Sequence, residues 1–217
     1  MTPERREESE MTEGFKRRTP SRWGEGGALK EEILAAAARM LMESGREGDL
    51  SLRAVAREVG ISAPSVYLHF KDRAELVATL TRRAYERLVA DLRGAAEGAG
   101  GGGPREALRA MARRYCRFAL DNPQRYRLMF GIEWIEGPRP RDGVDRHPSR
   151  MVYEVWVEAV RACRGDRTGA ADDERVARLL WFSLHGIVAM AVSMPFATSG
   201  QAMEEMADDL LDLAMTK

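Results

Sequence analysis

Residues 51–76 read SLRAVAREVGISAPSVYLHFKDRAEL, and this stretch decides the fold of the chain. Ser51 is a good N-cap for a short helix, and Gly60 ends that helix because glycine tolerates the left-handed conformation. Ser62 can cap a second short helix, whose first turn contains Pro64. The pattern therefore predicts two short helices that flank a tight turn. The apolar stripe of the first helix is Leu52, Val55, Ala56 and Val59.

Two short helices joined in this way form a helix-turn-helix, in which the second helix enters the major groove of DNA. Val66 and Phe70 lie one turn apart and are expected to point inward, which leaves small and polar residues outside. Small residues allow close approach to base edges, and the tyrosine, histidine and basic residues that follow are spaced to reach phosphates. Either Tyr67 or His69 alone could be an ordinary surface residue, but the turn, the caps and the spacing together favour DNA binding. The candidate DNA-binding residues are Ser51, Arg53, Ser62, Ala63, Pro64, Ser65, Tyr67, His69, Lys71 and Arg73.

This stretch resembles the tetracycline-repressor-like (TetR) family of transcriptional regulators. The likeness is carried by Gly60-Ile61-Ser62, by Tyr67 and Phe70, by Phe70-Lys71-Asp72-Arg73 leading to Leu76, and by the Ala-rich first helix with Gly45. The resemblance implies that the third helix is the recognition helix, that Tyr67 and Arg73 hold phosphates, and that the rest of the chain binds a small ligand and dimerises. The family usually has lysine where Arg73 stands, and arginine keeps the charge.

A second, weaker likeness lies beyond residue 95. The segment Tyr126-Arg127-Leu128-Met129-Phe130 and the spacing of Trp181, His185 and Gly186 are similar to one subgroup of regulator C-terminal domains in which Trp, His and Gly recur. This likeness implies nothing definite about the ligand.

The rest of the chain shows helical periodicity and no strand-like alternation of useful length. We therefore expect an all-α fold of about nine helices, with a three-helix head and a larger helical body. Residues 1–26 have few apolar side chains and are expected to form a disordered arm. Residues 27–75 are expected to be the helix-turn-helix domain, and residues 76–217 the ligand-binding and dimerisation domain. The expected helices of the chain are 28–45, 51–60, 62–70, 72–94, 104–120, a short one from 122, 149–163, 171–194 and 199–215.

Two pairs of residues are expected to cap later helices. Asp72 with Glu75 forms a capping box at the start of the fourth helix, and Thr198 with Gln201 could form one at the start of the last helix.

Composition limits the classes of protein that fit. The 217 residues include 34 basic and 34 acidic side chains, so no overall field draws the chain to nucleic acid or to an anionic membrane. The two cysteines have no paired spacing, and the N-terminal region lacks the apolar stretch of a secretory signal, so a reducing cytoplasm is expected. The apolar run 180–197 contains polar residues and a proline, so it fits a buried helix better than a membrane span, and we expect no membrane partner.

Aromatic side chains on several helices could line a ligand pocket, although core packing explains most of them. His185 is the best polar candidate because it lies on an otherwise apolar helix, and Trp181 lies one turn before it on the same face. We expect a small, largely apolar effector and no cofactor or metal. The candidate ligand-binding residues are Tyr115, Tyr126, Phe130, Trp134, Trp156, Trp181 and His185.

The last two helices carry apolar stripes that suggest a dimer. Packing within one chain is the simpler explanation, but a symmetric four-helix interface is better supported because a two-fold operator needs a two-fold protein. The stripes are Leu180, Leu184, Ile187, Val188 and Ala191 on one helix, and Met203, Met206, Leu210 and Leu213 on the other.

The function expected from these patterns is a ligand-responsive, sequence-specific DNA-binding regulator that acts as a homodimer on a palindromic operator, as a repressor. The alternatives are an all-helical enzyme and a small-molecule-binding protein without operator function. The three histidines are scattered and no HExxH or GxSxG signature occurs, which argues against an enzyme. Effector, operator sequence and regulated genes cannot be read from the sequence.

Overall fold

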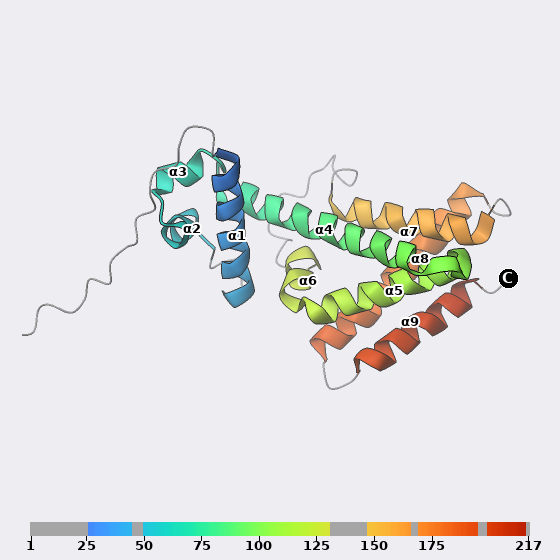
Figure 1. Cartoon of the computed structure of the whole chain (residues 1–217). Coiled ribbons are helices and arrows are strands. Elements are labelled where there is room, and N and C mark those ends of the chain that lie inside the picture. The colour runs from blue at the N-terminus through green and yellow to red at the C-terminus, as the bar shows by residue number, and fades with distance from the viewer. Residues whose placement is uncertain (1–25, 45–49, 131–146, 166–168, 195–198, 216–217) are drawn as a thin grey trace, which may run out of the picture. The chain divides into compact units, whose positions relative to one another are not determined.

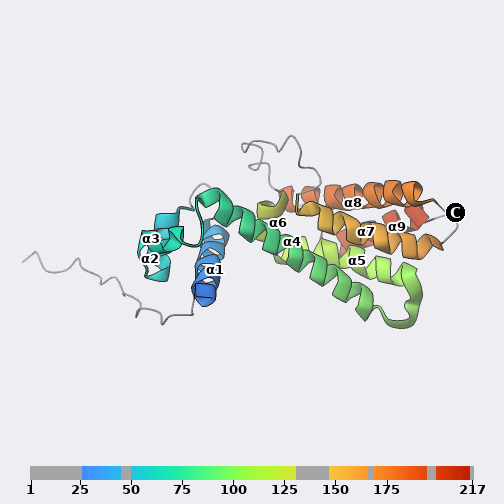
Figure 2. The ribbon, with the colours of Figure 1, turned by 90° about the horizontal axis from the view of Figure 1, so that it is seen from above.

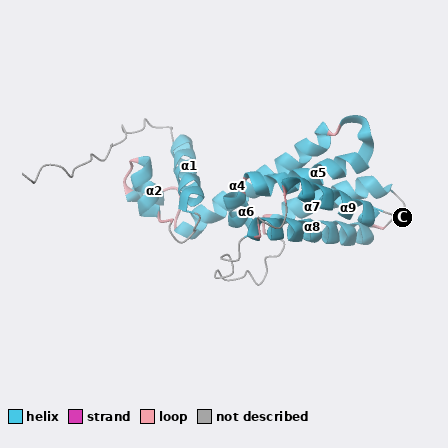
Figure 3. Cartoon of the chain, turned by 90° about the horizontal axis from the view of Figure 1, so that it is seen from below, coloured by secondary structure: helices cyan, strands magenta, loops and turns pink. Residues whose placement is uncertain are grey.

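The computed structural model describes residues 26–44, 50–130, 147–165, 169–194 and 199–215 (Figure 1). Within these ranges the chain forms nine α-helices, one short 3-10 helix and no strand (Figure 3), which confirms the expected all-α fold. Residues 1–25 of the expected disordered arm, and residues 131–146, lie outside the described residues, whereas Gly26 is the first residue of α1. The elements are α1 (Gly26–Ser44), α2 (Leu52–Val59), α3 (Ala63–Tyr67), α4 (Arg73–Gly98), η2 (Gly100–Gly102), α5 (Gly103–Asp121), α6 (Pro123–Phe130), α7 (Ser149–Arg164), α8 (Ala170–Ser193) and α9 (Gly200–Met215).

Two of the three caps predicted for α2 and α3 are present in the structure. Oγ of Ser51 accepts a hydrogen bond from the backbone N–H of Ala54 at 3.1 Å, and Gly60 adopts φ 76° to end α2. Ser62 differs from the prediction, because its side chain makes no capping bond and its Oγ lies 2.8 Å from Oγ of Ser65. The start of α3 therefore depends on Pro64, whose fixed φ suits the first turn.

The start of α4 is capped by the predicted pair, with a shift of one residue. Oδ1 of Asp72 accepts from the N–H of Glu75 at 2.8 Å, while the Glu75 carboxylate accepts from the N–H of Lys71 rather than of Asp72. The helix then runs to Gly98, four residues beyond the expected end at Gly94, because Ala95 and Ala96 favour helix.

The last helix begins differently from the prediction. Oγ of Ser199 accepts from the N–H of Ala202 at 3.1 Å, so Ser199 is the residue that caps α9. Thr198, the expected cap, lies outside the described residues.

The chain divides into two compact units, one ending at Ala78 and the other beginning at Thr79. This division falls inside α4, three residues after the boundary expected from the sequence. In the first unit α2 contacts both α1 and α3, and the three helices bury a small core. Its fully buried side chains include Ile33, Val55, Val66, Phe70 and Leu76.

The second unit is a helical bundle in which α5 contacts α6, α7, α8 and α9 (Figure 2). The part of α4 from Ala84 onward packs on the same core, because Tyr85, Leu88 and Leu92 are buried in it. This core supplies the hydrophobic stabilisation of the larger unit. The largest fully buried side chains there include Trp156, Tyr85, Tyr115, Phe118 and Met111.

A row of ion pairs joins α5 to α9. Four arginines occur at every fourth residue of α5 and therefore lie on one face, and three carboxylates do the same on α9. Because the helices run in opposite directions, the first arginine meets the last carboxylate. The pairs are Arg105 and Arg109 with Asp212, Arg109 and Arg113 with Asp208, and Arg117 with Glu204.

Candidate functional site

The outer side of α3 is open to solvent. Val66 and Phe70 are buried and anchor the helix from one side, as predicted, while Tyr67 on the opposite side is 51 % exposed. Each of the ten candidate DNA-binding residues is exposed or half-buried. The small residues Ser62 and Pro64 lie at the N-terminal end of α3, and Lys71 is exposed just beyond its C-terminal end. This is a surface that can approach a groove closely and carry positive charge beside it.

Three of these candidates make hydrogen bonds within the chain as well. Oγ of Ser51 caps α2, and the hydroxyl groups of Ser62 and Ser65 bond to each other. Arg73 is half-buried as the first residue of α4. Lys71 and Arg53 are the more exposed basic groups of this surface.

Sequence reasoning missed Leu68, which is 85 % exposed beside Tyr67. Leu68 is the C-cap of α3, so its side chain adds an apolar group to the open surface beside Tyr67. The signal was present in the sequence, because residue 68 lies halfway between the two inward positions, Val66 and Phe70, and must face outward.

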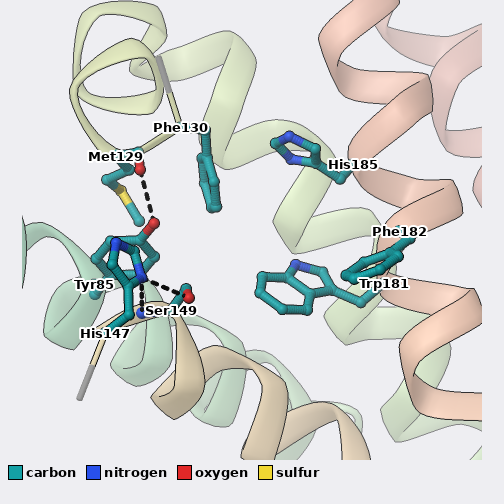
Figure 4. A pocket seen from close by; sticks show the side chains of 8 residues that line it. All are labelled: Tyr85, Met129, Phe130, His147, Ser149, Trp181, Phe182 and His185. Atoms are coloured by element: carbon teal, nitrogen blue, oxygen red, sulfur yellow. Dashed lines mark hydrogen bonds between the residues drawn. The ribbon is translucent and has the colours of Figure 1, made fainter. Parts of the chain in front are cut away.

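A pocket of about 290 Å³ lies in the second unit (Figure 4). Its walls come from four helices and from the residues just before α7, and they are mainly aromatic. The pocket is lined by Tyr85, Met129, Phe130, His147, Ser149, Trp181, Phe182 and His185.

Two tyrosine hydroxyls meet one ring nitrogen of His185 behind the pocket wall. The hydroxyl oxygens of Tyr126 and Tyr115 lie 2.7 Å and 3.1 Å from Nδ1 of His185. Burial lowers the pKa of His185 and raises the pKa of both tyrosines, so all three groups are neutral near pH 7. The network holds the histidine ring against the pocket.

Trp181 contributes a buried indole N–H to the same region. Among the described residues, no acceptor has the distance and angle for a hydrogen bond with Nε1 of Trp181. It lies close enough to Tyr115 to oppose in part the effect of burial on the pKa of that hydroxyl. The indole N–H is therefore a donor that no good acceptor satisfies.

The six candidate ligand-binding residues that the structure describes fall into three groups. Phe130, Trp181 and His185 line the pocket, whereas Tyr115 and Tyr126 lie behind it and reach it only through His185. Trp156 is fully buried in the core, with its ring 6.0 Å from that of Tyr115, and is absent from the pocket wall. Trp134 lies outside the described residues.

The sequence did not point to the remaining pocket residues. Tyr85 was not among the candidate ligand-binding residues, and its hydroxyl donates to the carbonyl of Met129 at 2.7 Å. Spacing along the chain gives no sign that these side chains meet, because they come from elements far apart in sequence. The residues missed are Tyr85, Met129, His147, Ser149 and Phe182.

The stripes predicted for the dimer face largely inward in this chain. Leu180, Leu184, Val188, Ala191 and Met203 are buried in the core of their own unit, so they are not available to a partner. The outward apolar residues of α8 form a different set, whereas two members of the stripe predicted on α9 do face outward. The exposed residues are Leu179, Phe182 and Met190 on α8 with Met194 at its C-terminal end, and Met206 and Leu213 on α9.

By length and composition α8 could also cross a membrane. It is the one helix among the described residues with this property, and 33 % of its most apolar window is buried. Contacts with α5, α7 and α9 show that it belongs to the bundle. Leu179, Phe182 and Met190 remain exposed on its outer side.

Within the described part of the chain, no three side chains among His, Cys, Asp and Glu lie together in a way that could hold a metal ion.

Comparison with known proteins identifies both units. Residues 33–80 match the family model for bacterial regulatory proteins of the tetR family, and residues 108–214 match the model for the tetracyclin repressor-like C-terminal domain. The HTH-type transcriptional regulator Mb1846 of Mycobacterium bovis is 31 % identical over 103 residues, which cover 48 % of this chain and 44 % of that protein. The match thus spans less than half the length of this curated relative.

Solved structures extend the likeness to most of the chain. A protein of unknown function from Rhodococcus sp. RHA1 is 30 % identical, with a TM-score of 0.69 over 84 % of this chain and 93 % of that one. The putative regulatory protein SCO4313 is 27 % identical, with a TM-score of 0.66 over 89 % and 98 % of the two chains. A complex of SmeT with triclosan, 21 % identical over 86 % and 91 % of the two chains, shares the fold with a TM-score of 0.62. Since family models match in both units and a relative aligns over most of both chains, this chain belongs to the TetR family.

Proposed function

We propose that this chain is a ligand-responsive, sequence-specific DNA-binding regulator that represses transcription in the cytoplasm. The observation that carries the proposal is the open outer side of α3, which stands on the buried anchors Val66 and Phe70. A short helix with small residues at its N-terminal end fits the width of the major groove.

The contacts with DNA divide into two kinds. Ser62, Ala63, Pro64 and Ser65 meet base edges, where hydroxyls donate or accept and apolar groups contact a thymine methyl. Tyr67, His69 and the basic groups hold phosphates and set the register of the protein on the duplex. Leu68, exposed at the same end of α3, adds an apolar contact to a sugar or a methyl group. The phosphate contacts come from Ser51, Arg53, Tyr67, His69, Lys71 and Arg73.

The active form is a homodimer on a palindromic operator, with the outward faces of α8 and α9 as the interface. Leu179, Phe182 and Met190 follow one side of α8 at helical spacing. Gly186 lies on the same side, and a methyl group added there would meet no atom within 4 Å, so a partner helix can approach closely. Two such helices from each copy form a four-helix interface related by a two-fold axis.

The pocket provides the response to a ligand. Tyr85 of α4 lines it, so a bound molecule contacts the same helix that continues past Ala78 into the DNA-binding unit. A hundredfold change in operator affinity needs about 2.7 kcal/mol of differential ligand binding between two states of the protein. The structural relative SmeT is known as a complex with triclosan, which supports a small aromatic effector.

Selection of the full-length protein against random duplexes tests the proposal. We expect enrichment of an inverted repeat whose half-sites lie about one helical turn apart. Failure to enrich any sequence by a protein that still binds small molecules would favour the alternative of a ligand-binding protein without operator function. Turnover of a bound compound would favour the enzyme alternative, which membership of a regulator family argues against.

A further inference from the structure

The pocket combines aromatic walls with hydrogen-bond donors from one helix. We propose that it selects an uncharged aromatic molecule whose carbonyl-type oxygen accepts hydrogen bonds from His185 and Trp181 of α8. The proposal rests on the ligand response proposed above and specifies the chemical class of the effector.

Trp181 is the first reason for an acceptor. Its side chain is nine-tenths buried, and its N–H has no hydrogen-bond partner within hydrogen-bond geometry among the described residues. The edge of the indole that carries the nitrogen faces the space between Trp181, His185 and Phe130 (Figure 4). A buried donor without a partner is costly, and a ligand oxygen in this space removes that cost.

His185 is the second reason. The short contact of 2.7 Å between the Tyr126 hydroxyl and Nδ1 is best made as an O–H···N bond. Among the described residues, the other acceptors near that hydroxyl are the Tyr115 hydroxyl and the carbonyl of His185, which is 3.5 Å away. Nδ1 is then the acceptor of a neutral ring, and the proton resides on Nε2. His185 thus has one N–H group, on Nε2, which is the second donor at the pocket wall after the N–H of Trp181.

The remaining polar groups of the wall are already engaged. The Tyr85 hydroxyl donates to the carbonyl of Met129, and Oγ of Ser149 lies 2.7 Å from Nδ1 of His147. Both hydroxyl groups already donate a hydrogen bond within the protein, so they can only accept one from a ligand. Among the N–H groups of the wall, those of Trp181 and His185 lie one turn apart on α8.

The described part of the wall carries no formal charge, which disfavours an ionised ligand. No lysine, arginine, aspartate or glutamate is among the described residues that line the pocket. A carboxylate that entered would lose its hydration without meeting a cation. A volume of about 290 Å³, roughly that of ten water molecules, limits the ligand to a compact molecule.

Three probes of similar shape test this proposal by calorimetry on the full-length protein without DNA. Diphenylmethane offers two aromatic rings and no acceptor, benzophenone adds a carbonyl between the rings, and 4-benzoylbenzoate adds a charge. We expect benzophenone to bind about tenfold more tightly than either of the other two.

Substitution of a single indole provides the matched control. Trp181→Phe removes the N–H from the pocket, and we expect the preference for benzophenone over diphenylmethane to fall to about twofold or less. Trp156→Phe makes the same chemical change at a tryptophan that is buried elsewhere in the core and has the same unpaired N–H. We expect this control to keep the full preference.

The outcomes separate the effector class from the wider function. Equal affinity for diphenylmethane and benzophenone, tighter binding of 4-benzoylbenzoate, or no binding of any probe overturns the proposed class. If Trp181→Phe fails to fold, the relative affinities of the three probes for the unsubstituted protein still test the proposed effector class. Benzophenone that binds as expected but leaves the protein on its operator contradicts the ligand response and leaves the class of molecule intact.

Discussion

The hydroxyl oxygen of Tyr126 on α6 lies 2.7 Å from Nδ1 of His185 on α8, directly behind the pocket wall. This contact joins two helices and fixes the orientation of the histidine ring. Tyr126→Phe removes the hydroxyl, and we expect the free energy of unfolding to fall by about 1 kcal/mol. We also expect weaker binding of benzophenone, because Nδ1 then keeps only the longer contact with the Tyr115 hydroxyl at 3.1 Å and can carry the proton in place of Nε2. Urea unfolding and calorimetry measure the two effects.

Tyr153→Phe is the control for this change. The Tyr153 hydroxyl donates to the carbonyl of Glu174 at 3.2 Å, and the residue is not part of the pocket wall. An equal loss of benzophenone affinity in both variants would contradict the positioning role of Tyr126.

The free energy of unfolding should fall as the pH decreases below the ordinary pKa of histidine. Burial lowers the pKa of His185 and of His147, so below about pH 6.5 the unfolded chain takes up protons that the folded chain does not. The full stability is present above that pH and is lost as the pH falls toward the lowered pKa values. In His185→Phe we expect a smaller loss of the free energy of unfolding between about pH 7.5 and pH 5.5, measured by urea titration. An unchanged loss would contradict a buried, neutral His185.

The ion pairs between α5 and α9 give a prediction about salt. Asp208 accepts from both Nε and Nη2 of Arg113 and lies 3.5 Å from Arg109. Asp208→Asn should lower the free energy of unfolding by about 1 kcal/mol at low salt and by less near 1 M salt, where exposed charges are screened. Asp209→Asn, at the exposed neighbouring position, should change it little. A larger loss of stability in Asp209→Asn than in Asp208→Asn would show that the ion pairs with α5 do not stabilise the packing of α9.

Much of this architecture follows from local rules in the sequence. Ser51, Gly60 and Asp72 mark helix ends by chemistry that acts within four residues, so their positions could be predicted. The open face of α3 follows from the inward pair Val66 and Phe70. These features need no knowledge of the rest of the fold.

The pocket and the outer face of α8 could not be predicted in the same way. Tyr85 and Phe182 meet at one pocket only because distant helices pack together. From Leu179 onward α8 is apolar on most sides, so periodicity did not reveal that the stripe of Leu180 faces the core of its own chain while Leu179 faces outward. The side of α8 that faces the core is decided by helix packing, which depends on the whole chain.

The outward face of α8 gives a prediction about assembly. Met190 is 55 % exposed on this face, and Met190→Glu places a charge in the proposed interface. We expect the variant to sediment as a monomer and to lose operator affinity. Met42→Glu replaces a methionine that is 48 % exposed on α1 and should leave the dimer intact. A dimeric Met190→Glu protein would place the interface elsewhere, and a variant that partitions into vesicles less than the natural protein would indicate a membrane surface.

The salt dependence of operator affinity tests most directly whether the helix-turn-helix reads DNA. Each lysine that neutralises a phosphate contributes about one unit to the slope of log affinity against log salt concentration. For Lys71→Gln we expect the slope to fall by about one unit for each copy of Lys71 in the complex, with the same sequence preference, and for Arg127→Gln on α6 no change. If Lys71→Gln and Tyr67→Phe bind the selected duplex with the affinity and slope of the natural protein, the surface built on α3 is not the one that holds DNA.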